Sequence, residues 1–139
     1  MRGCPIEETV ELVGDRWSLL LVGALLAGPR RTTQLVADLA PISTRTLAER
    51  LKRLEAAGIL TRHSYPESPP RVEYQLTERG FELRRVLAAF RTAATAWDLP
   101  ACADATCPQC GSNGSSPGSA HEHSETRRGP ADGIDVTLL

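Results

Sequence analysis

The sequence predicts a mainly α-helical fold of the α+β class, in which a two-stranded hairpin precedes a long last helix. Two observations predict this fold. Over residues 5–58 apolar residues recur at helical spacing, whereas two runs within residues 59–76 alternate between apolar and polar. A third observation sets the boundary, because the chain beyond residue 99 is rich in Gly, Ser and Pro and buries too little apolar area to offset its chain entropy. We therefore expect a folded domain over residues 1–98 and a Cys-, Gly- and Ser-rich tail over residues 99–139 that is largely disordered.

Two helices are predicted at the start of the domain. The first ends at Gly14, and one of its faces is lined by Ile6, Val10 and Val13. Asp15 is the predicted N-cap of the second helix, which covers Trp17–Ala27 and ends at the helix-breaking pair Gly28-Pro29.

The third and fourth helices are also delimited by the sequence. Thr32 or Thr33 caps a short third helix that continues through Leu39. Its inward-facing side chains are Leu35, Val36 and Leu39. Ser43 caps the fourth helix, which ends at Gly58. The fourth helix has an apolar stripe at positions i, i+4 and i+7, formed by Leu47, Leu51 and Leu54.

After the fourth helix the pattern changes from helical to alternating. Ile59–Tyr65 and Val72–Leu76 read as paired strands, joined by a proline-rich turn that ends at Arg71. Thr77 then opens a last helix that continues to about Trp97. Four of its apolar residues are available for burial, namely Phe81, Val86, Leu87 and Phe90. This order of elements is that of a winged helix-turn-helix with a long C-terminal helix.

Composition narrows the class of protein. The 139 residues have a net charge of −1 at pH 7, but residues 30–91 hold twelve basic and seven acidic residues. No apolar run approaches the roughly 20 residues that span a bilayer, and the N-terminal MRGCPIEE lacks the pattern of a signal peptide. The folded part contains no catalytic set, phosphate-binding loop or cofactor fingerprint. We therefore expect a cytoplasmic protein that is not an enzyme and does not associate with membranes.

The fourth helix is the candidate DNA-reading element. With its leucine stripe inward, Arg45 and Lys52 point directly outward and Arg53 lies close by. Hydroxyls at its N-terminus can bond base edges in the major groove, while its arginines meet guanine or phosphate. Arg71, at the exit of the hairpin turn, suits the minor groove or its phosphates. The candidate DNA-binding residues are Ser43, Thr44, Arg45, Thr46, Arg50, Lys52, Arg53 and Arg71.

A resemblance to a known family covers roughly residues 4–97. The segments that show it are CPIEETVELVGDRWSLLLVGALLAGPRRTTQLVADL, ISTRTLAERLKRLEAAGIL and YPESPPRVEYQLTERG. They resemble the HxlR family of bacterial winged-helix transcription regulators, within the MarR-like superfamily. The resemblance implies a homodimer, held by the N-terminal and last helices, on a two-fold symmetric operator. It assigns Ser43, Thr44, Arg45 and Arg50 to the recognition helix and Arg71 to the wing. Some members sense oxidants or electrophiles through a cysteine near the N-terminus, where this chain has Cys4.

We therefore predict a sequence-specific transcriptional regulator that binds a palindromic operator as a homodimer, under control by thiol oxidation, electrophiles or metal. A dimer seam is predicted along the last helix, through Phe81, Phe90, Ala93, Ala94 and Trp97, unless these side chains pack on their own domain. The alternatives are a winged-helix module that binds protein rather than DNA, and a thiol-redox protein. The basic outer face of the fourth helix favours the regulator.

The cysteines leave several interpretations open. Cys4 is either a reactive thiol or a small buried hydrophobe. In the tail, Cys107 and Cys110 have the C-x₂-C spacing of a zinc knuckle, with Cys102 available as a third ligand and His121 or His123 as a fourth. A redox dithiol at Cys107 and Cys110 and a tail without function are equally compatible with the spacing. The C-x₄-C-x₂-C spacing also matches part of an iron–sulfur ligand set, but its fourth cysteine is missing downstream. No cofactor is required by the predicted function.

Overall fold

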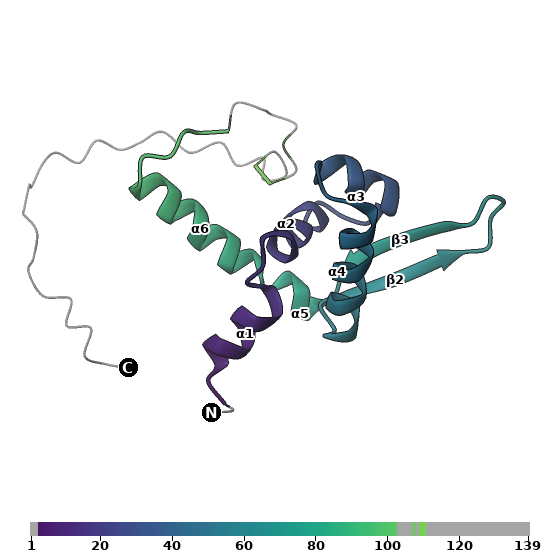
Figure 1. Cartoon of the computed structure of the whole chain (residues 1–139), viewed down its shortest axis with the longest axis horizontal. Helices are drawn as coiled ribbons and strands as arrows, with labels where there is room; N and C mark the ends of the chain where they lie inside the picture. Colours follow the sequence, from purple (N-terminus) through teal and green to yellow (C-terminus); the bar gives the residue numbers. More distant parts are fainter. Residues whose placement is uncertain (1–2, 103–106, 108, 111–139) are drawn as a thin grey trace, which may run out of the picture.

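In a computed structural model of the chain, residues 3–102, 107, 109 and 110 are described (Figure 1). Their helices and strands follow the predicted order, with one added strand and a divided last helix. The elements are α1 (Pro5–Val13), α2 (Arg16–Leu25), β1 (Arg30–Arg31), α3 (Thr32–Asp38), α4 (Thr44–Ala56), β2 (Leu60–Tyr65), β3 (Arg71–Leu76), α5 (Glu78–Phe81) and α6 (Arg84–Ala96). The chain therefore has a winged helix-turn-helix fold, as the sequence predicts.

The hydrophobic core lies where α2, α3 and α4 meet the base of the hairpin. Its fully buried members include Leu21 of α2, Leu35 of α3 and Leu47 and Leu54 of α4. Figure 1 shows α2, α3 and α4 at the centre of the molecule, with the β2–β3 hairpin extending to one side and α1 and α6 on the other. The core thus fixes α4 by its leucine face and leaves the opposite face in solvent.

The sheet has three strands in the order β1-β3-β2, and both pairs are antiparallel. In the hairpin, Leu60 pairs with Leu76 and Tyr65 pairs with Arg71. Beyond Leu60 every residue of β2 is exposed, although its sequence alternates, because the hairpin projects from the body and both its faces meet solvent (Figure 1). The projecting hairpin is the wing.

The predicted start of the third helix is shifted by pairing with β3. The third helix is capped by Arg31, not by Thr32 or Thr33, because Arg31 pairs with Glu73 in β1 and remains extended until the helix begins. The side chain of Gln34 accepts a hydrogen bond from the Arg31 backbone N–H at 2.8 Å, which satisfies this end of the helix. The fourth helix begins after Ser43, as predicted.

The predicted single last helix is divided into α5 and α6. Backbone bonds from Leu83 to Gly80 and from Val86 to Leu83 tighten the chain between the two helices. Leu83 is buried in the core, while Gly80 lies so close to the Ile59 carbonyl that any side chain would overlap it. Burial of Leu83 therefore sets the direction in which α6 leaves the core.

Several large apolar side chains remain in solvent on α1, α5 and α6. Ile6 and Val10 are exposed on α1, of whose residues Val13 alone is fully buried. Phe81 and Phe90, which the sequence offers for burial, are also exposed, as is Trp97 after α6. Figure 1 shows α1 and α6 on the side away from the wing. In the described part of the chain, this side of the molecule thus presents exposed apolar side chains.

Most of the tail lies outside the described residues. The prediction that the tail is largely disordered concerns these residues and is therefore not tested. Its described members near residue 110 lie against the domain: the side-chain amide of Gln109 donates to the Leu20 carbonyl of α2 at 2.7 Å. Arg91 of α6 donates to the Gln109 carbonyl at 2.8 Å. Among the described residues, no helix is long and apolar enough to cross a membrane.

Candidate nucleic-acid interface

In the first turn of α4, some of the predicted DNA-binding residues cap the helix and the others are exposed. The Ser43 hydroxyl accepts the backbone N–H of Thr46 at 3.1 Å and donates to the Thr46 hydroxyl at 2.8 Å. Both hydroxyls thus stabilise the helix N-terminus. Thr44 and Arg45 lie next to them and are exposed. Of the four predicted polar contacts at this end, Thr44 and Arg45 are therefore the ones whose side chains are directed into solvent.

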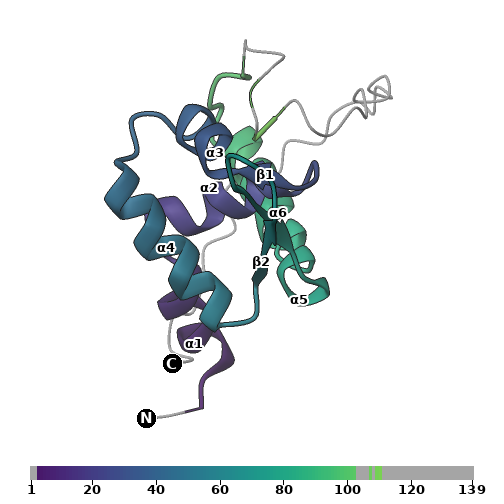
Figure 2. The same cartoon turned by 90° about the vertical axis from the view of Figure 1, so that its right-hand side faces the viewer.

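The outer face of α4 is basic and exposed. The helix holds four basic and two acidic residues. The Arg45 side chain is 90% exposed, and its Nε lies 3.3 Å from the Oε1 of Glu49, on the next turn. An exposed pair of this kind contributes about 0.3–0.5 kcal/mol, so a DNA phosphate or guanine edge can replace the carboxylate at low cost. Lys52 is exposed on the same face, and Figure 2 shows α4 along one edge of the molecule.

Arg50 does not point freely outward, although the sequence places it among the DNA contacts. Its Nε lies 3.1 Å from the Asp15 Oδ1, and its side chain is 28% exposed. Asp15 also accepts the backbone N–H groups of Trp17 and Ser18 as the N-cap of α2. Burial raises the pKa of Asp15, but these hydrogen bonds and the Arg50 charge outweigh it, so the pKa lies below 3.8. Arg50 therefore joins α4 to the start of α2.

Arg53 is exposed but also has a structural partner. Its guanidinium donates a hydrogen bond to the backbone carbonyl of Glu11, in the last turn of α1. α4 is thus linked to α1 by Arg53 and to the α1–α2 junction by Arg50. These links connect residues far apart in the sequence, so no local spacing could predict them.

The wing arginine is held by its own hairpin. The Arg71 guanidinium lies 3.5 Å from Glu67 and 3.5 Å from Glu73, and it stacks on the Tyr65 ring at 4.2 Å from the centroid. Glu73 is also 3.8 Å from Arg31 of β1. Arg71 therefore stabilises the base of the turn, where the sequence predicts only a DNA contact. Arg62, which is exposed on β2, is a wing cation that the sequence argument did not include.

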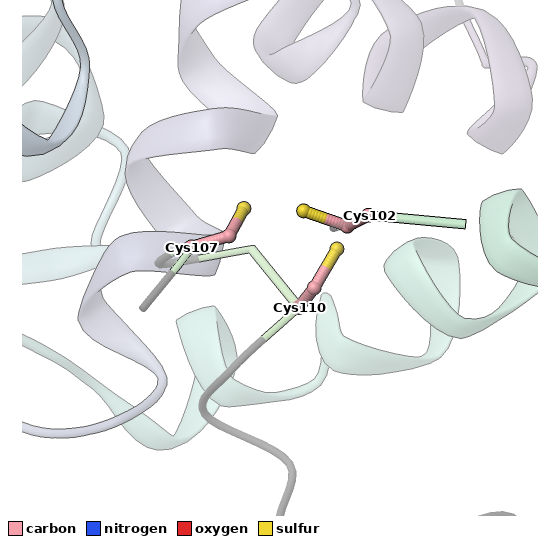
Figure 3. Close-up of side chains that lie close together, drawn as sticks. All are labelled: Cys102, Cys107 and Cys110. Carbon is pink, nitrogen blue, oxygen red and sulfur yellow. The ribbon is translucent and has the colours of Figure 1, made fainter. Parts of the chain in front are cut away.

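The cysteines occupy two separate places. Cys4 is exposed at the N-cap of α1 and makes no side-chain cap hydrogen bond. The thiols of Cys102, Cys107 and Cys110 converge beside α2 and α6, with all three sulfur atoms within 4.8 Å of one another (Figure 3). The structure therefore brings together the three cysteines that the sequence offers as metal ligands.

The three thiols do not have equivalent surroundings. Burial raises the pKa of the Cys107 thiol, but hydrogen bonds from the Gln109 backbone and its thiol neighbours hold that pKa below its ordinary value. Burial and the neighbouring thiols raise the pKa of Cys110 to about 11. In a cluster of this kind one thiolate forms readily and repels the formation of a second.

The part of the chain that contains α4 and the wing also matches known proteins. A family profile described as HxlR-like helix-turn-helix matches residues 12–100. The chain belongs to the HxlR family. An HTH-type transcriptional regulator of Synechocystis sp. is 48% identical over 94 residues, which cover 68% of this HxlR protein and 70% of the relative. The resemblance seen in the sequence is therefore confirmed.

Solved structures share the HxlR fold as well. The reduced form of the transcriptional regulator YodB from B. subtilis aligns with a TM-score of 0.63 at 37% identity, over 72% of this chain and 99% of that one. The redox regulator HypR in its reduced form aligns with a TM-score of 0.63 at 31% identity, over 67% of this chain and 92% of that one. The profile match contains every candidate residue of α4 and the wing, whereas Cys4 and the three clustered cysteines lie outside it.

Proposed function

We propose that two copies of this HxlR regulator bind a palindromic operator, each placing α4 in the major groove of one half-site. The observation that carries this proposal is the division of α4 into a fully buried leucine face and an exposed basic face. A helix held in this way presents its cations at a fixed angle, which direct readout of base edges requires. Because DNA is the partner, the protein acts in the cytoplasm.

The residues of the interface divide into two groups in this proposal. Thr44, Arg45 and Lys52 contact bases and phosphates, because their side chains are exposed. The others position the helix and the wing while adding positive charge near the DNA backbone, namely Ser43, Thr46, Arg50, Arg53 and Arg71. The Glu67 carboxylate is half-exposed, so a phosphate can take its place beside Arg71 when the wing meets DNA.

A second copy of the chain covers the apolar side formed by α1 and α6. Ile6 and Phe90 are 75% and 57% exposed, and Trp97 is 72% exposed. Uncovered aromatic and aliphatic side chains of this size mark an interaction surface. A two-fold dimer through these helices would present two α4 helices to half-sites one helical turn of DNA apart.

Thiol oxidation at Cys4 is the proposed control. The solved structures that resemble this chain include HypR in reduced and oxidised forms and YodB in reduced and diamide-treated forms. In this chain Cys4 is exposed at the start of α1, and the far end of α1 accepts the hydrogen bond from Arg53 of α4. A change at Cys4 therefore acts on the helix that joins the proposed dimer surface to the DNA-reading helix. No cofactor is needed for this function.

The DNA interface is tested by selecting random duplexes with the reduced protein and measuring affinity for the enriched sequence. We expect an inverted repeat, and we expect Arg45→Glu to weaken binding by about 10–100-fold, since a good arginine–guanine contact is worth about 1–3 kcal/mol. The matched control is Arg79→Glu in α5, on the opposite side from α4 (Figure 2), which should change affinity by less than about twofold at moderate salt. Equal losses in both variants, or no enriched sequence at low salt, would favour the protein-interaction module.

The thiol control is tested with the same duplex before and after treatment with diamide. We expect oxidation to weaken operator binding by the wild type and to leave binding by Cys4→Ser unchanged. A triple variant with Ser at positions 102, 107 and 110 is the control, and it should respond to oxidation like the wild type. If Cys4→Ser still loses binding on oxidation, Cys4 is not the sensor.

A further inference from the structure

Cys102, Cys107 and Cys110 form the densest group of metal-ligating side chains among the described residues. Their sulfur atoms lie within 4.8 Å of one another, and Figure 3 shows all three directed toward one point. Tetrahedral zinc with Zn–S bonds of about 2.3 Å requires sulfur atoms about 3.8 Å apart. The cluster therefore needs to contract by about 1 Å or less to hold one ion.

The local backbone suits such a site. Cys107 and Cys110 flank a tight turn, in which the Cys110 N–H donates to the Cys107 carbonyl at 3.1 Å. This C-x₂-C turn directs two sulfur atoms to the same side, and Cys102 approaches from the segment that follows α6 (Figure 3). Thiolates are soft ligands that select zinc over magnesium or calcium. A dithiol switch would use only two of these residues, whereas a metal site uses all three.

The turn is also attached to the folded domain. Gln109, between the two cysteines of the turn, donates to the Leu20 carbonyl at 2.7 Å, and its own carbonyl accepts from Arg91 at 2.8 Å. A side chain at Gly23 would overlap the Gln109 amide oxygen, so the turn lies directly on α2. The guanidinium of Arg91 brings positive charge close to a site that becomes anionic when three thiolates bind a divalent ion.

The same turn borders a cavity between α2 and α6. The cavity has a volume of about 510 Å³ and is lined mainly by apolar side chains, with Gln109 and Cys110 at its edge. Leu20 of α2 and Phe90 of α6 line its two walls. A rigid turn at this edge would hold the two helices at a fixed separation.

We propose that Cys102, Cys107 and Cys110 bind one Zn²⁺ through three thiolates, and that the ion fixes the turn at residues 107–110 against α2 and α6. The fourth position belongs to water or another donor from outside the cluster. Binding releases the thiol protons to solvent, so affinity falls as the pH is lowered. This site is independent of the DNA interface, and its test uses no DNA.

Cobalt titration of the reduced, metal-depleted full-length protein tests the site, because cobalt bound by thiolates gives an intense charge-transfer absorption. We expect one equivalent to bind and to be displaced by one equivalent of zinc. Single changes Cys102→Ser, Cys107→Ser and Cys110→Ser should each weaken binding by about 10-fold or more, while Cys4→Ser should bind like the wild type. Absence of the band in the wild type, or its loss in Cys4→Ser, would overturn the proposal. An unchanged affinity in Cys102→Ser would replace it with a two-cysteine site.

Two further variants test attachment of the turn without removing a thiol. Gln109→Ala deletes the hydrogen bond to Leu20, and Gly23→Ala displaces the same amide from the α2 side. Both should still bind one equivalent of cobalt, with affinity lowered by a similar factor of about 3–10, as expected for lost support around a metal site. Circular dichroism checks that both variants are folded. Unchanged affinity in both would show that the metal site is not attached to α2.

Discussion

α4 and α6 are both thirteen residues long and both amphipathic, yet they use their apolar faces differently. α4 buries Leu47, Leu51 and Leu54 in the core of its own chain. Within the described structure none of the α6 side chains is fully buried, and Phe90 is exposed. The comparison shows that helical periodicity identifies a face that has to be covered, but it does not identify what covers it.

The difference follows from where each helix lies. α4 is surrounded by α2, α3 and the base of the wing, so its leucines meet apolar partners from the same chain. α6 contacts α2 through Val86 and Leu87, which are partly buried, and then extends beyond the core. Among the described residues, the later part of α6 has no core left to pack on, which is why we place the proposed dimer surface there.

The largest expected effect is a loss of protomer stability when the buried face of α4 is changed. Leu54→Ala leaves a cavity in the core and should lower the free energy of unfolding of the protomer by about 2–5 kcal/mol. Urea unfolding, with circular dichroism as the signal, measures this loss. A loss below about 1 kcal/mol would mean that α4 is not held by its leucine face, and the comparison with α6 would fail.

The second largest expected effect is a weaker proposed dimer when the exposed face of α6 is changed. The double variant Phe90→Ala/Trp97→Ala should raise the dissociation constant of the dimer by about 30-fold or more, because the loss of even one aromatic anchor worth about 2 kcal/mol has an effect of this size. Sedimentation velocity at a series of concentrations measures it. Circular dichroism should show that the protomer remains folded, in contrast to Leu54→Ala.

The matched control on α6 is Arg85→Ala, whose side chain is exposed and pairs with Glu82 of the preceding turn. It should leave the dissociation constant within about twofold of the wild type. A wild type that sediments as a monomer, or a double variant that sediments as the wild type does, would exclude α6 as the dimer surface.

The smallest expected effect is on stability, and it tests the ion pair between Asp15 and Arg50 that orients α4. Asp15→Asn keeps a side-chain oxygen as the cap of α2 but removes the charge opposite Arg50, so stability at pH 7 should fall by about 1 kcal/mol. The pKa of Asp15 is lowered in the folded state, so its contribution is complete above pH 3.8 and is lost as the pH falls through the folded-state pKa. The wild type and the variant should therefore converge in stability as the pH falls below the folded-state pKa of Asp15.

Urea unfolding at pH 7 and at several values below pH 3.8 measures this dependence. Glu49→Gln, which removes the exposed partner of Arg45, is the control and should cost no more than about 0.5 kcal/mol at pH 7. A stability difference for Asp15→Asn that stays constant with pH would assign the effect to capping rather than to the Arg50 ion pair.

The sequence predicts those features of the molecule whose causes are local. The cap at Ser43, the leucine spacing and Gly58, which has a positive φ of 72°, together define α4 within a few residues. β1 could not be predicted, because Arg30 and Arg31 form a strand only by pairing with β3. The break between α5 and α6 likewise depends on burial of Leu83 in the core, which is set by tertiary packing.

The candidate DNA-binding residues also show how far the sequence alone can predict side-chain contacts. Residue type and helical phase correctly identified Arg45 and Lys52 as exposed on the outer face of α4. They could not show that Arg50 meets Asp15, since this partner is set by tertiary packing. Nor did they show that Arg71 meets Glu67 and Glu73 within its own hairpin. Helical phase therefore predicts that a cation is exposed, but it does not predict the acidic partners that hold it.

On α4 the side chains that face solvent are different from those that hold the helix in place. This separation makes α4 a suitable scaffold for changing the DNA sequence that the protein prefers under the proposed function. Thr44, Arg45 and Lys52 can be randomised together without disturbing a buried contact, because all three are exposed. Arg50, which is tied to Asp15, would be kept constant along with the leucines. A library built in this way varies operator preference on an unchanged framework, so selection for a new target sequence need not also select for folding.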